Sequence, residues 1–342
     1  MGNEFLVRMS AQLREQRRAL RDWLGGVPPA ERSLRLGPHP QHALDEHMHV
    51  LDDAIVRADE GELGRCTVCH EHVESHWLQM DYTSCVCIEH LTGEERAQLE
   101  SELELSQRVQ RALLPQEAPE IPGFEVAAYS QPASIVGGDY FDFLRFADGA
   151  HAVVIADVMG KGMPASMLMA SLQAYLRVVL PESSAPAEVL RRLNRLFCHN
   201  IHLTKFVSLV VARVAPEGGG VTYGNAGHHP PLLLRGKGGD SALTQLRPTG
   251  AAIGLVEHAS FAEAHVVMEP GDLLIFYTDG VVEARDQEGR EFGDESLARY
   301  AADHRAMPPG GFVRGLRQHL QLFTAGQPLS DDTTIVALRR AG

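Results

Sequence analysis

Apolar residues recur at helical spacing along the first part of the chain. Residues 3 to 24 carry Phe5, Leu6, Met9, Leu13 and Leu20 near the helical repeat, which predicts an amphipathic helix. A second helix is predicted over residues 41 to 60, and Gly and Pro residues fill the stretch between the two. Two helices joined in this way predict an antiparallel hairpin.

A third helix is predicted over residues 93 to 114, where Leu99, Leu103, Val109 and Leu113 form an apolar stripe among Glu, Gln and Arg residues. Pro115 ends it, and a Pro-rich connector follows. The stripe is too short and irregular to establish a coiled coil. Two interpretations stay open: a homodimer through this linker helix, or packing of the helix on the next domain.

From Phe124 onward, short β-like runs alternate with turns and longer helical stretches. Strands are predicted at 153 to 156, 206 to 214, 232 to 234, 273 to 277 and 334 to 338, and helices at 164 to 179, 186 to 201, 294 to 304 and 310 to 323. This pattern predicts an α+β domain with a strand-dominated core. We therefore divide the chain into a first domain at 1–92, a linker helix at 93–115 and a second domain at 116–342.

Composition and charge narrow the classes of partner. The 342 residues are 44% hydrophobic and 22% charged, as expected for a globular protein, and the formal net charge is -14. That charge argues against nucleic acid as a main partner. The N-terminus lacks the pattern of a secretory signal, and the longest apolar stretch, 163 to 180, is interrupted by polar residues. We expect no membrane span and a cytoplasmic location.

Aspartate residues stand next to apolar runs at four places. Asp139, Asp157 and Asp279 follow such runs, and the pair Asp331 and Asp332 precedes one. Poorly solvated carboxylates need partners, and two hard divalent cations close together need several carboxylate ligands. Each Asp taken alone is better interpreted as a helix cap or turn residue. Four together favour a site for two metal ions that activate water and hold a phosphoryl group.

The segments around these residues resemble the metal-dependent PPM phosphatases, in their SpoIIE/RsbU-like branch, over residues 105 to 340. The matching segments occur in family order: 110–115, 122–127, 136–142, 155–162, 223–231, 270–272, 277–284 and 331–334. The resemblance implies a β-sandwich flanked by helices, two Mn²⁺ or Mg²⁺ ions at one end, and hydrolysis of phosphoserine or phosphothreonine. It also implies a phosphorylated protein substrate, in this branch an anti-anti-sigma protein of a partner-switching pathway.

Carried over from the family, Asp157 is expected to bridge the two metals, together with the backbone carbonyl of Val158. Asp139 is expected to support the metal shell, and Asp279 with Asp331 to hold the second metal. Asp332 is the alternative to its neighbour Asp331. Asp157, Asp279 and Asp139 are therefore the predicted catalytic residues.

Two features depart from the wider family. Eukaryotic relatives place a His shortly after an Asp-Gly pair as general acid, whereas Val158 and Met159 follow Asp157 here. His228 is a candidate for this role, and a structural turn histidine is the alternative. No phosphate-binding Arg of those relatives has a clear match. Cys198 is not needed as a nucleophile and is interpreted as a buried helix residue.

Four of the 5 Cys residues crowd into the segment 66 to 87. Cys66 and Cys69 form one CxxC knuckle, and 17 residues later Cys87 and His90 have the same spacing, which predicts a tetrahedral Zn²⁺ site. Cys85 is a spare thiol that could replace Cys87 or tune the site. Three nearby histidines, His70, His72 and His76, are interpreted as solvated loop residues, because a closed site needs only four ligands.

The sequence 58 to 69 is similar to the zinc finger of the DksA/TraR family, over about residues 41 to 95. That family usually has Cys at the fourth ligand position, where this chain has His90. The resemblance implies a structural Zn²⁺ and does not by itself imply binding to RNA polymerase.

The sequence therefore predicts a PPM-type protein serine/threonine phosphatase regulated by a zinc-finger module in front of it. One alternative is a transcription-linked adaptor that uses the phosphatase fold as a scaffold. Another is a zinc or redox sensor, suggested by Cys85 near Cys87.

Overall fold

The computed structural model describes all residues except 1–2, 27–39, 74–77, 79–81, 201–205, 216–218, 237–242 and 328. Its internal contacts divide the chain into two compact units, Met1–Glu102 and Leu103–Gly342. The predicted turn between the first two helices and His76 lie outside the described residues.

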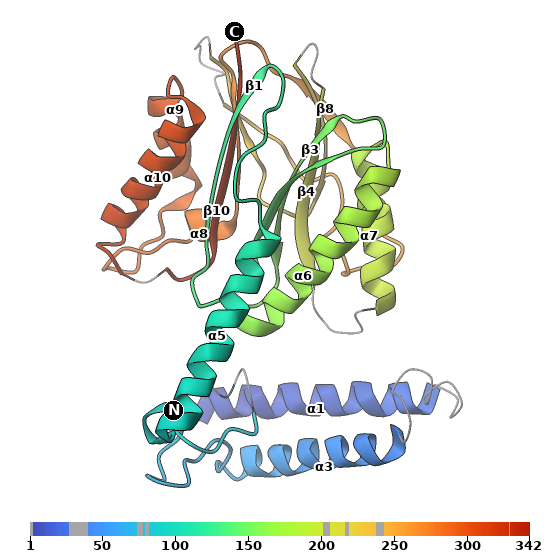
Figure 1. Cartoon of the computed structure of the whole chain (residues 1–342), viewed down its shortest axis with the longest axis vertical. Coiled ribbons are helices and arrows are strands. Elements are labelled where there is room, and N and C mark those ends of the chain that lie inside the picture. Colours follow the sequence, from blue (N-terminus) through green and yellow to red (C-terminus); the bar gives the residue numbers. More distant parts are fainter. Residues whose placement is uncertain are drawn as a thin grey trace. The chain divides into compact units, whose positions relative to one another are not determined.

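The first unit is built on two helices, α1 (Asn3–Gly26) and α3 (Pro40–Asp59), which lie side by side (Figure 1). Leu6, Met9 and Leu13 of α1 share a buried cluster with Leu51 and Ile55 of α3, so the apolar stripes predicted from the sequence face each other. The same cluster contains Cys66 and Cys87, so the cysteine segment packs on the hairpin.

The linker helix α5 (Gly93–Leu113) follows the short helix η1 (Ile88–His90). Thr92 and Glu95 form a capping box at its start: the Glu95 N–H donates to Thr92 Oγ1 at 3.2 Å, and the Thr92 N–H donates to Glu95 Oε2 at 2.9 Å. The sequence therefore fixes where this helix begins.

The second unit contains ten strands and the remaining helices, among the residues described. Its strands are β1 (Phe124–Gln131), β2 (Tyr140–Arg145), β3 (His151–Val158), β4 (Val207–Val214), β5 (Gly220–Ala226), β6 (Leu232–Leu234), β7 (Leu243–Gln245), β8 (Ala264–Val267), β9 (Leu273–Tyr277) and β10 (Thr333–Arg340). Its helices are α6 (Gly162–Val179), η2 (Leu180–Glu182), α7 (Pro186–Asn200), α8 (Asp279–Val282), α9 (Gly293–His304) and α10 (Pro309–Phe323).

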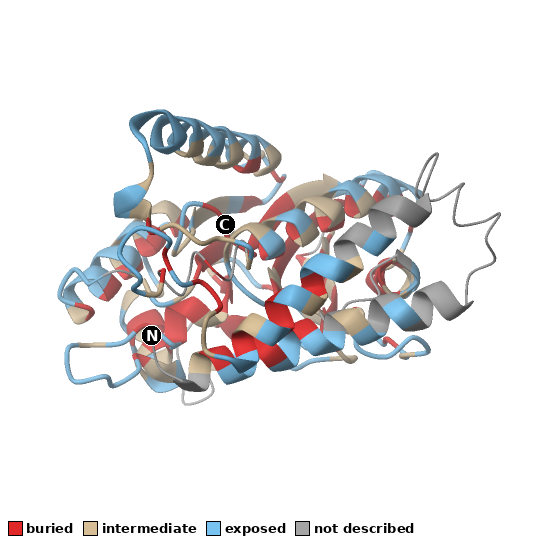
Figure 2. Cartoon of the chain, turned by 90° about the horizontal axis from the view of Figure 1, so that it is seen from below, coloured by how far each residue is buried: buried red, intermediate tan, exposed pale blue. Residues whose placement is uncertain are grey.

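The strands form two antiparallel sheets, in the orders β1-β10-β9-β6-β7 and β2-β3-β4-β5-β8. Side chains such as Ile155, Val210 and Phe276 fill the space between them. Helices α9 and α10 cover the outer face of the first sheet, and α6 and α7 cover that of the second (Figure 1). Buried residues gather on the strands and on the inner faces of the helices (Figure 2).

The predicted α+β class, with a β-sandwich flanked by helices and a helical hairpin in front, is confirmed. The four predicted helices of the second unit are present within two residues of their expected ends. Five strands were not predicted: β1, β2, β5, β7 and β8. β8 has half-exposed and exposed residues only, and β7 has three residues, so neither carries a strong strand pattern.

The segment Gly162–Glu182 passes a test for membrane-spanning helices that uses length and hydropathy alone. The sequence analysis had discounted this stretch because polar residues interrupt it. In the structure its buried side, with Met169, Leu172 and Leu176, packs in the core against the second sheet. A helix that covers a sheet has the same composition as a spanning segment, so this result is weak evidence for a membrane helix.

Candidate functional site

The five predicted metal-site aspartates come together at one end of the sandwich. Asp139 directly precedes β2, and Asp157 is the second-last residue of β3. Asp279 follows β9, and the pair Asp331 and Asp332 precedes β10. In the antiparallel pairs β2–β3 and β9–β10, the start of one strand lies beside the end of the other. Each sheet therefore brings its carboxylates to the same edge, and the two edges meet.

Asp139 is buried and links the two sheets. Its Oδ2 accepts hydrogen bonds from Thr278 Oγ1 and Thr334 Oγ1, each at 2.7 Å. Its Oδ1 is buried and has no hydrogen-bond partner among the described residues. Burial, and then the charges of Asp157 and Asp332, raise the pKa of Asp139 well above its usual value. One oxygen is thus held in place by two threonines, while the other has no partner among the described residues.

Asp331 and Asp332 have different surroundings. The carboxylate of Asp332 accepts backbone N–H groups of Ala133 at 2.8 Å and Gly138 at 2.6 Å, with Asp139 N at 3.4 Å. Asp331 Oδ2 instead forms an ion pair with Lys161 Nζ at 2.8 Å and is partly exposed. Asp332 therefore holds the loop before β2, whereas Asp331 contacts the ammonium group of Lys161.

The remaining carboxylates raise one another's pKa. Burial comes first for Asp157, followed by the charges of Asp279, Asp331 and others, and together they raise the pKa of Asp157 to about 7. Burial, Asp331 and Glu283 also raise the pKa of Asp279. Sequence reasoning missed Glu283, although it lies four residues after Asp279 on the turn of α8 and its charge acts on both aspartates.

Two glycines allow the backbone before β2 to lie close to the other residues of the site. A Cβ atom on Gly138 would lie 2.7 Å from the carbonyl oxygen of Val158, the predicted backbone ligand. One on Gly137 would lie 2.2 Å from the Asp332 carboxylate. Gly137 is also bound by α5, because Gln110 Oε1 accepts its N–H at 3.0 Å and Gln110 Nε2 donates to its carbonyl at 2.6 Å. The sequence analysis did not predict this reciprocal pair.

His228 has the geometry of the structural alternative. It is buried, its Nδ1 lies 2.7 Å from Ser208 Oγ, and its backbone is held by the side chain of Asn225. Burial, and then the neighbouring His229, lower the pKa of His228 to about 3, so the ring is neutral. His229 is less buried, and its charge acts on Asp279. Of the two histidines, His229 is the one that affects the pKa of Asp279, and its ring lies 5.8 Å from that of Tyr277.

Cys198 lies on α7 and is partly exposed, not fully buried as expected. Its thiol lies 3.8 Å from Asn194 Oδ1, away from the aspartate cluster. Nothing in its surroundings gives it a role in the site.

The acidic end of the sandwich fits divalent cations. Four aspartates and Glu283 face one another with raised pKa values in Asp139, Asp157 and Asp279, and one buried Asp139 oxygen has no partner among the described residues. Like charges in such a group are stabilised by hard cations with oxygen ligands. Among the described residues, Lys161 forms an ion pair with one member of the group, Asp331.

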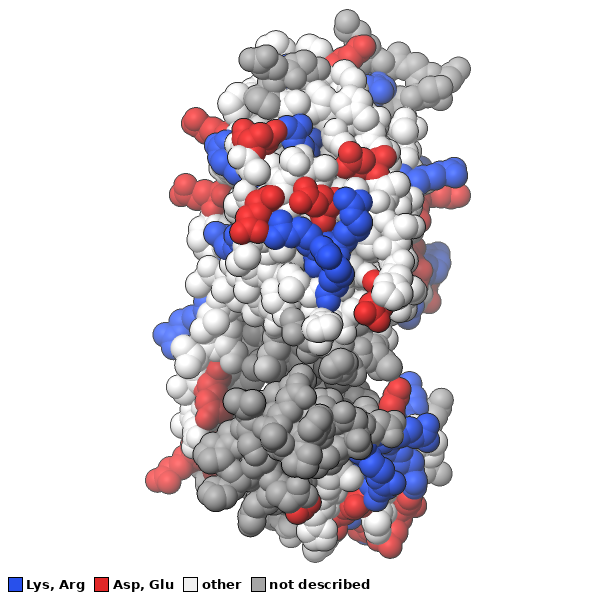
Figure 3. Space-filling view, turned by 90° about the vertical axis from the view of Figure 1, so that its right-hand side faces the viewer, with Lys and Arg blue, Asp and Glu red and all other residues white. Residues whose placement is uncertain are grey.

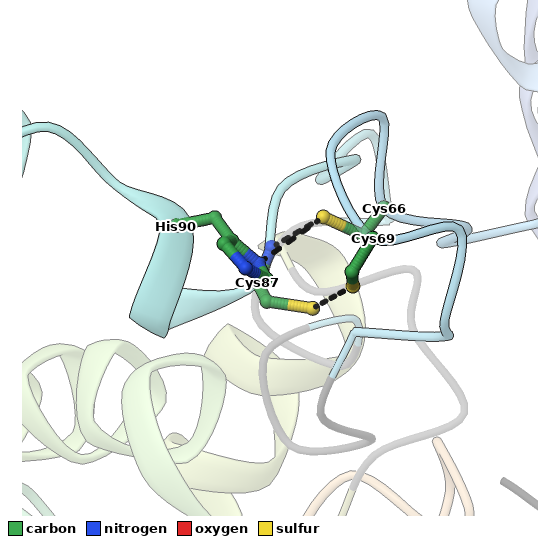
Figure 4. Close-up of side chains that lie close together, drawn as sticks. All are labelled: Cys66, Cys69, Cys87 and His90. Atoms are coloured by element: carbon green, nitrogen blue, oxygen red, sulfur yellow. Dashed lines mark hydrogen bonds between the residues drawn. The ribbon is translucent and has the colours of Figure 1, made fainter.

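A second cluster lies in the first unit, where Cys66, Cys69, Cys87 and His90 point toward one another (Figure 4). Their ligand atoms all lie within 4.8 Å of one another, with Cys69 Sγ 3.8 Å from Cys87 Sγ and Cys66 Sγ 3.7 Å from His90 Nδ1. Four ligands bound to one Zn²⁺ at about 2.3 Å place sulfur atoms about 3.8 Å apart. These distances match the edges of such a tetrahedron.

Hydrogen bonds prepare Cys66 to be a thiolate. Burial opposes ionisation, but backbone N–H groups, among them those of Val68 and Cys87 at 3.4 Å each, lower the pKa of Cys66 to about 6. Burial and then the neighbouring sulfur atoms raise the pKa of Cys87 to about 12. A cation at the centre would relieve this repulsion.

Cys85 and the other described histidines lie outside this group of four ligand atoms. His72 Nε2 lies 2.9 Å from the Gly61 carbonyl oxygen, and His70 is exposed.

Comparison with known proteins identifies the second unit. The pattern of the family Stage II sporulation protein E (SpoIIE) matches residues 147–341. Phosphoserine phosphatase RsbU of Bacillus subtilis (strain 168) is 29% identical over 244 residues, which cover 71% of this chain and 71% of the relative. Phosphoserine phosphatase RsbP of the same organism is 25% identical over 186 residues, or 53% of this chain and 45% of the relative.

Two solved structures have the same fold. The SiaA-PP2C domain of Pseudomonas aeruginosa superposes with a TM-score of 0.63 at 20% identity, covering 71% of this chain and 98% of that one. The RsbU and RsbW domains of Rv1364c from Mycobacterium tuberculosis give a TM-score of 0.55 at 29% identity, covering 65% and 61%. With a family match over more than half of its 342 residues, the chain belongs to the SpoIIE family, and its second unit is a PPM-type protein serine/threonine phosphatase domain.

Proposed function

We propose that the chain hydrolyses phosphoserine or phosphothreonine on a regulatory protein, with Asp139, Asp157, Asp279 and Asp331 and the Val158 carbonyl holding two Mn²⁺ or Mg²⁺ ions. The observation that carries this proposal is the buried Oδ1 of Asp139, which has no hydrogen-bond partner among the described residues and lies among carboxylates with raised pKa values. The bound ions would supply Lewis-acid activation of water and neutralise charge on the phosphoryl group. Asp332 holds the Gly138 loop and is proposed as a positioning residue.

The residues of the chain have separate tasks in this proposal. Thr278 and Thr334 fix one oxygen of Asp139, which orients the other toward the site. His229, whose charge acts to lower the pKa of Asp279, is the histidine that we assign to the leaving group. His228, neutral and buried, fixes the turn that carries its neighbour.

The test is hydrolysis of a phosphoserine peptide with Mn²⁺, compared with EDTA and with Asp279→Ala. Asp303→Ala, an exposed position on α9, is the matched control. We expect metal-dependent turnover that is lost in the first variant and kept in the control. Turnover only after removal of residues 1–90 would indicate an autoinhibited enzyme, and none in either form would contradict the proposal and favour the adaptor alternative.

We propose that the partner is an anti-anti-sigma-type phosphoprotein in the cytoplasm, because the relative RsbU is a phosphoserine phosphatase and the matched domains of Rv1364c include an RsbW domain beside an RsbU domain. Phosphate release from a purified anti-anti-sigma protein, compared with the same protein carrying Ala at its phosphorylated Ser, tests this step. Equal release from an unrelated phosphoprotein would argue against such specificity.

We further propose one structural Zn²⁺ on Cys66, Cys69, Cys87 and His90, supported by the ligand distances. In this proposal the hairpin and finger regulate the enzyme through α5, which also offers exposed Leu105 and Val109 for a homodimer. Metal analysis of the purified protein should give one zinc per chain. Sedimentation of Leu105→Glu and Val109→Glu variants tests the dimer, which both charges should weaken.

A further inference from the structure

Two neighbouring hollows lie beside β1, at one edge of the sandwich in the second unit. The larger, of about 300 Å³, lies between β1, β2 and α10, and the smaller, of about 200 Å³, lies between β1, α10 and the last turns of α5. Both are lined by Tyr129 and Arg317, so the two hollows lie on either side of these side chains. We call the two hollows together the edge groove.

The edge groove lies where the sheets end. β1 and β2 are the outermost strands of their sheets on this side. Half of the backbone N–H and C=O groups of an edge strand point away from its neighbour, so β1 has groups that β10 does not bind. The core between the sheets reaches the surface here, because Phe141 and Phe143 of β2 line the larger hollow together with Ala128 of β1.

Three arginines line the two hollows, of which the larger carries the apolar side chains. Arg314 and Arg317 are exposed on α10, and Arg111 is exposed near the end of α5. Arg317 lies 5.0 Å over the Tyr129 ring. Within the described part of the chain none of the three forms an ion pair, although the net charge is -14 and Glu117 lies at the rim. Unpaired Arg side chains beside aromatic rings are typical of sites that bind carboxylate groups.

We propose that the edge groove binds an extended acidic segment of a partner protein, with an apolar side chain in the larger hollow and carboxylates on Arg314, Arg317 and Arg111. The two hollows follow β1, which suits an extended chain that also uses the strand's free backbone groups. A nucleic-acid backbone or a free phosphate would meet the arginines and leave the apolar lining of the larger hollow uncovered. The charge and the apolar lining together therefore favour a peptide.

The position of the groove connects it to the catalytic loop. Gln107 and Gln110 line the smaller hollow, and Gln110 is the residue that holds Gly137 through two hydrogen bonds. A segment bound along β1 would hold the last turn of α5 against that strand. Binding in the groove therefore acts on the loop before Asp139 without entering the acidic cluster.

A phage-displayed library of short random peptides, selected on the full-length protein, tests the proposal. The counter-target is the double variant Arg314→Glu/Arg317→Glu, and the matched control is Arg299→Glu, an exposed Arg on α9 outside the groove. Both changes are on the surface, and circular dichroism with thermal melting checks that the variants fold. Selected peptides are then labelled with fluorescein and titrated by fluorescence anisotropy.

We expect enrichment of peptides in which acidic residues flank an apolar one. Their affinity should fall about tenfold or more in the double variant, because two attractive charges become repulsive, and should change less than about twofold in the control. Ala118→Trp, at an exposed position in the lining of the larger hollow, should weaken the same peptides by filling the space. The proposal is overturned if no peptide distinguishes the wild type from the double variant, or if acidic peptides without an apolar residue bind equally well.

Discussion

At the acidic end of the sandwich, some carboxylate oxygens hold the fold through hydrogen bonds, and others are available to a ligand. Asp139 does both, since one oxygen is fixed by Thr278 and Thr334 and the other has no partner among the described residues. Asp332 uses its oxygens on backbone N–H groups, whereas Asp331 contacts Lys161. Substitution of Asp331 can therefore be compared with the same substitution of its neighbour Asp332, which serves as the control.

We expect Asp331→Asn to affect mainly Mn²⁺ binding and Asp332→Asn to affect mainly the stability of the fold. The first should weaken Mn²⁺ binding more than about tenfold, or about 1.4 kcal/mol, and leave the melting temperature of the metal-free protein nearly unchanged. The second places an amide NH₂ against backbone N–H donors and should lower the free energy of unfolding by about 1–3 kcal/mol. Calorimetric titration and denaturant unfolding separate the two, and a larger Mn²⁺ effect in Asp332→Asn would reverse our assignment.

Metal binding should depend on pH through Asp157. Its folded pKa, about 7, is above its unfolded value, so the stability that this group contributes to the metal-free fold is lost as the pH rises through about 7. Mn²⁺ must displace the proton, so its affinity should increase from about pH 6 to about pH 8 while the metal-free protein melts at a lower temperature. Titrations across this range check both trends, and an affinity independent of pH would contradict a raised pKa at the site.

At the scale of elements, α5 connects to the loop before Asp139 through Gln110, with a longer hydrogen bond from Gln107 beside it. Gln110 is buried in the last turns of α5 and binds both backbone groups of Gly137, two residues before Asp139. A shift of the helix would therefore move the loop that carries the metal site. Gln107, Gln110, Arg111 and Leu114 lie on the same side of this helical segment and line the smaller hollow beside β1.

Gln110→Ala should reduce Mn²⁺ affinity about tenfold, in the range seen when groups behind metal ligands are removed. Gln107→Ala is the matched control, because that side chain makes only a long bond of 3.4 Å to the Ile135 carbonyl and should change affinity little. Both proteins are compared by calorimetric titration and by hydrolysis of a phosphopeptide. Equal behaviour of the two variants would mean that α5 does not reach the site through Gln110.

At the scale of the whole molecule, each compact unit has its own core and its own candidate ion site. Cys66 and Cys87 belong to the buried cluster of the first unit, so the proposed Zn²⁺ would stabilise that core. The aspartates belong to the second unit, where burial and the charges of neighbouring carboxylates raise the pKa of Asp157. Lys and Arg side chains are interspersed with Asp and Glu on the face seen in Figure 3.

Two separate responses to metal are therefore expected in one calorimetric experiment. Phenanthroline should lower the melting temperature of the first unit by about 4–8 °C for each kcal/mol of zinc binding that is lost. Mn²⁺ should raise the melting temperature of the second unit and leave the first unchanged. Cys66→Ser should reproduce the phenanthroline effect, and a single transition that responds equally to both treatments would contradict two independent sites.

Sequence alone determined the elements whose signals are local. The apolar stripes of α1 and α5 have helical spacing, and Pro115 ends α5, so these helices were predicted, as was α3. The capping box at Thr92 was found only in the structure. Strands β7 and β8 were missed because short or exposed strands depend on their neighbours and not on an apolar pattern. The Cys66 and Cys87 knuckles were predicted because metal ligands recur at fixed spacing.

Tertiary structure decided what each polar residue does. Sequence placed four aspartate positions at apolar runs, but only the packing of two sheets brings them to one edge and separates Asp331 from Asp332. The same holds for His228 and His229, whose burial differs although they are adjacent. Local pattern fixes periodicity and covalent spacing, whereas burial, charge proximity and the partner of each hydrogen bond arise from segments far apart in the chain.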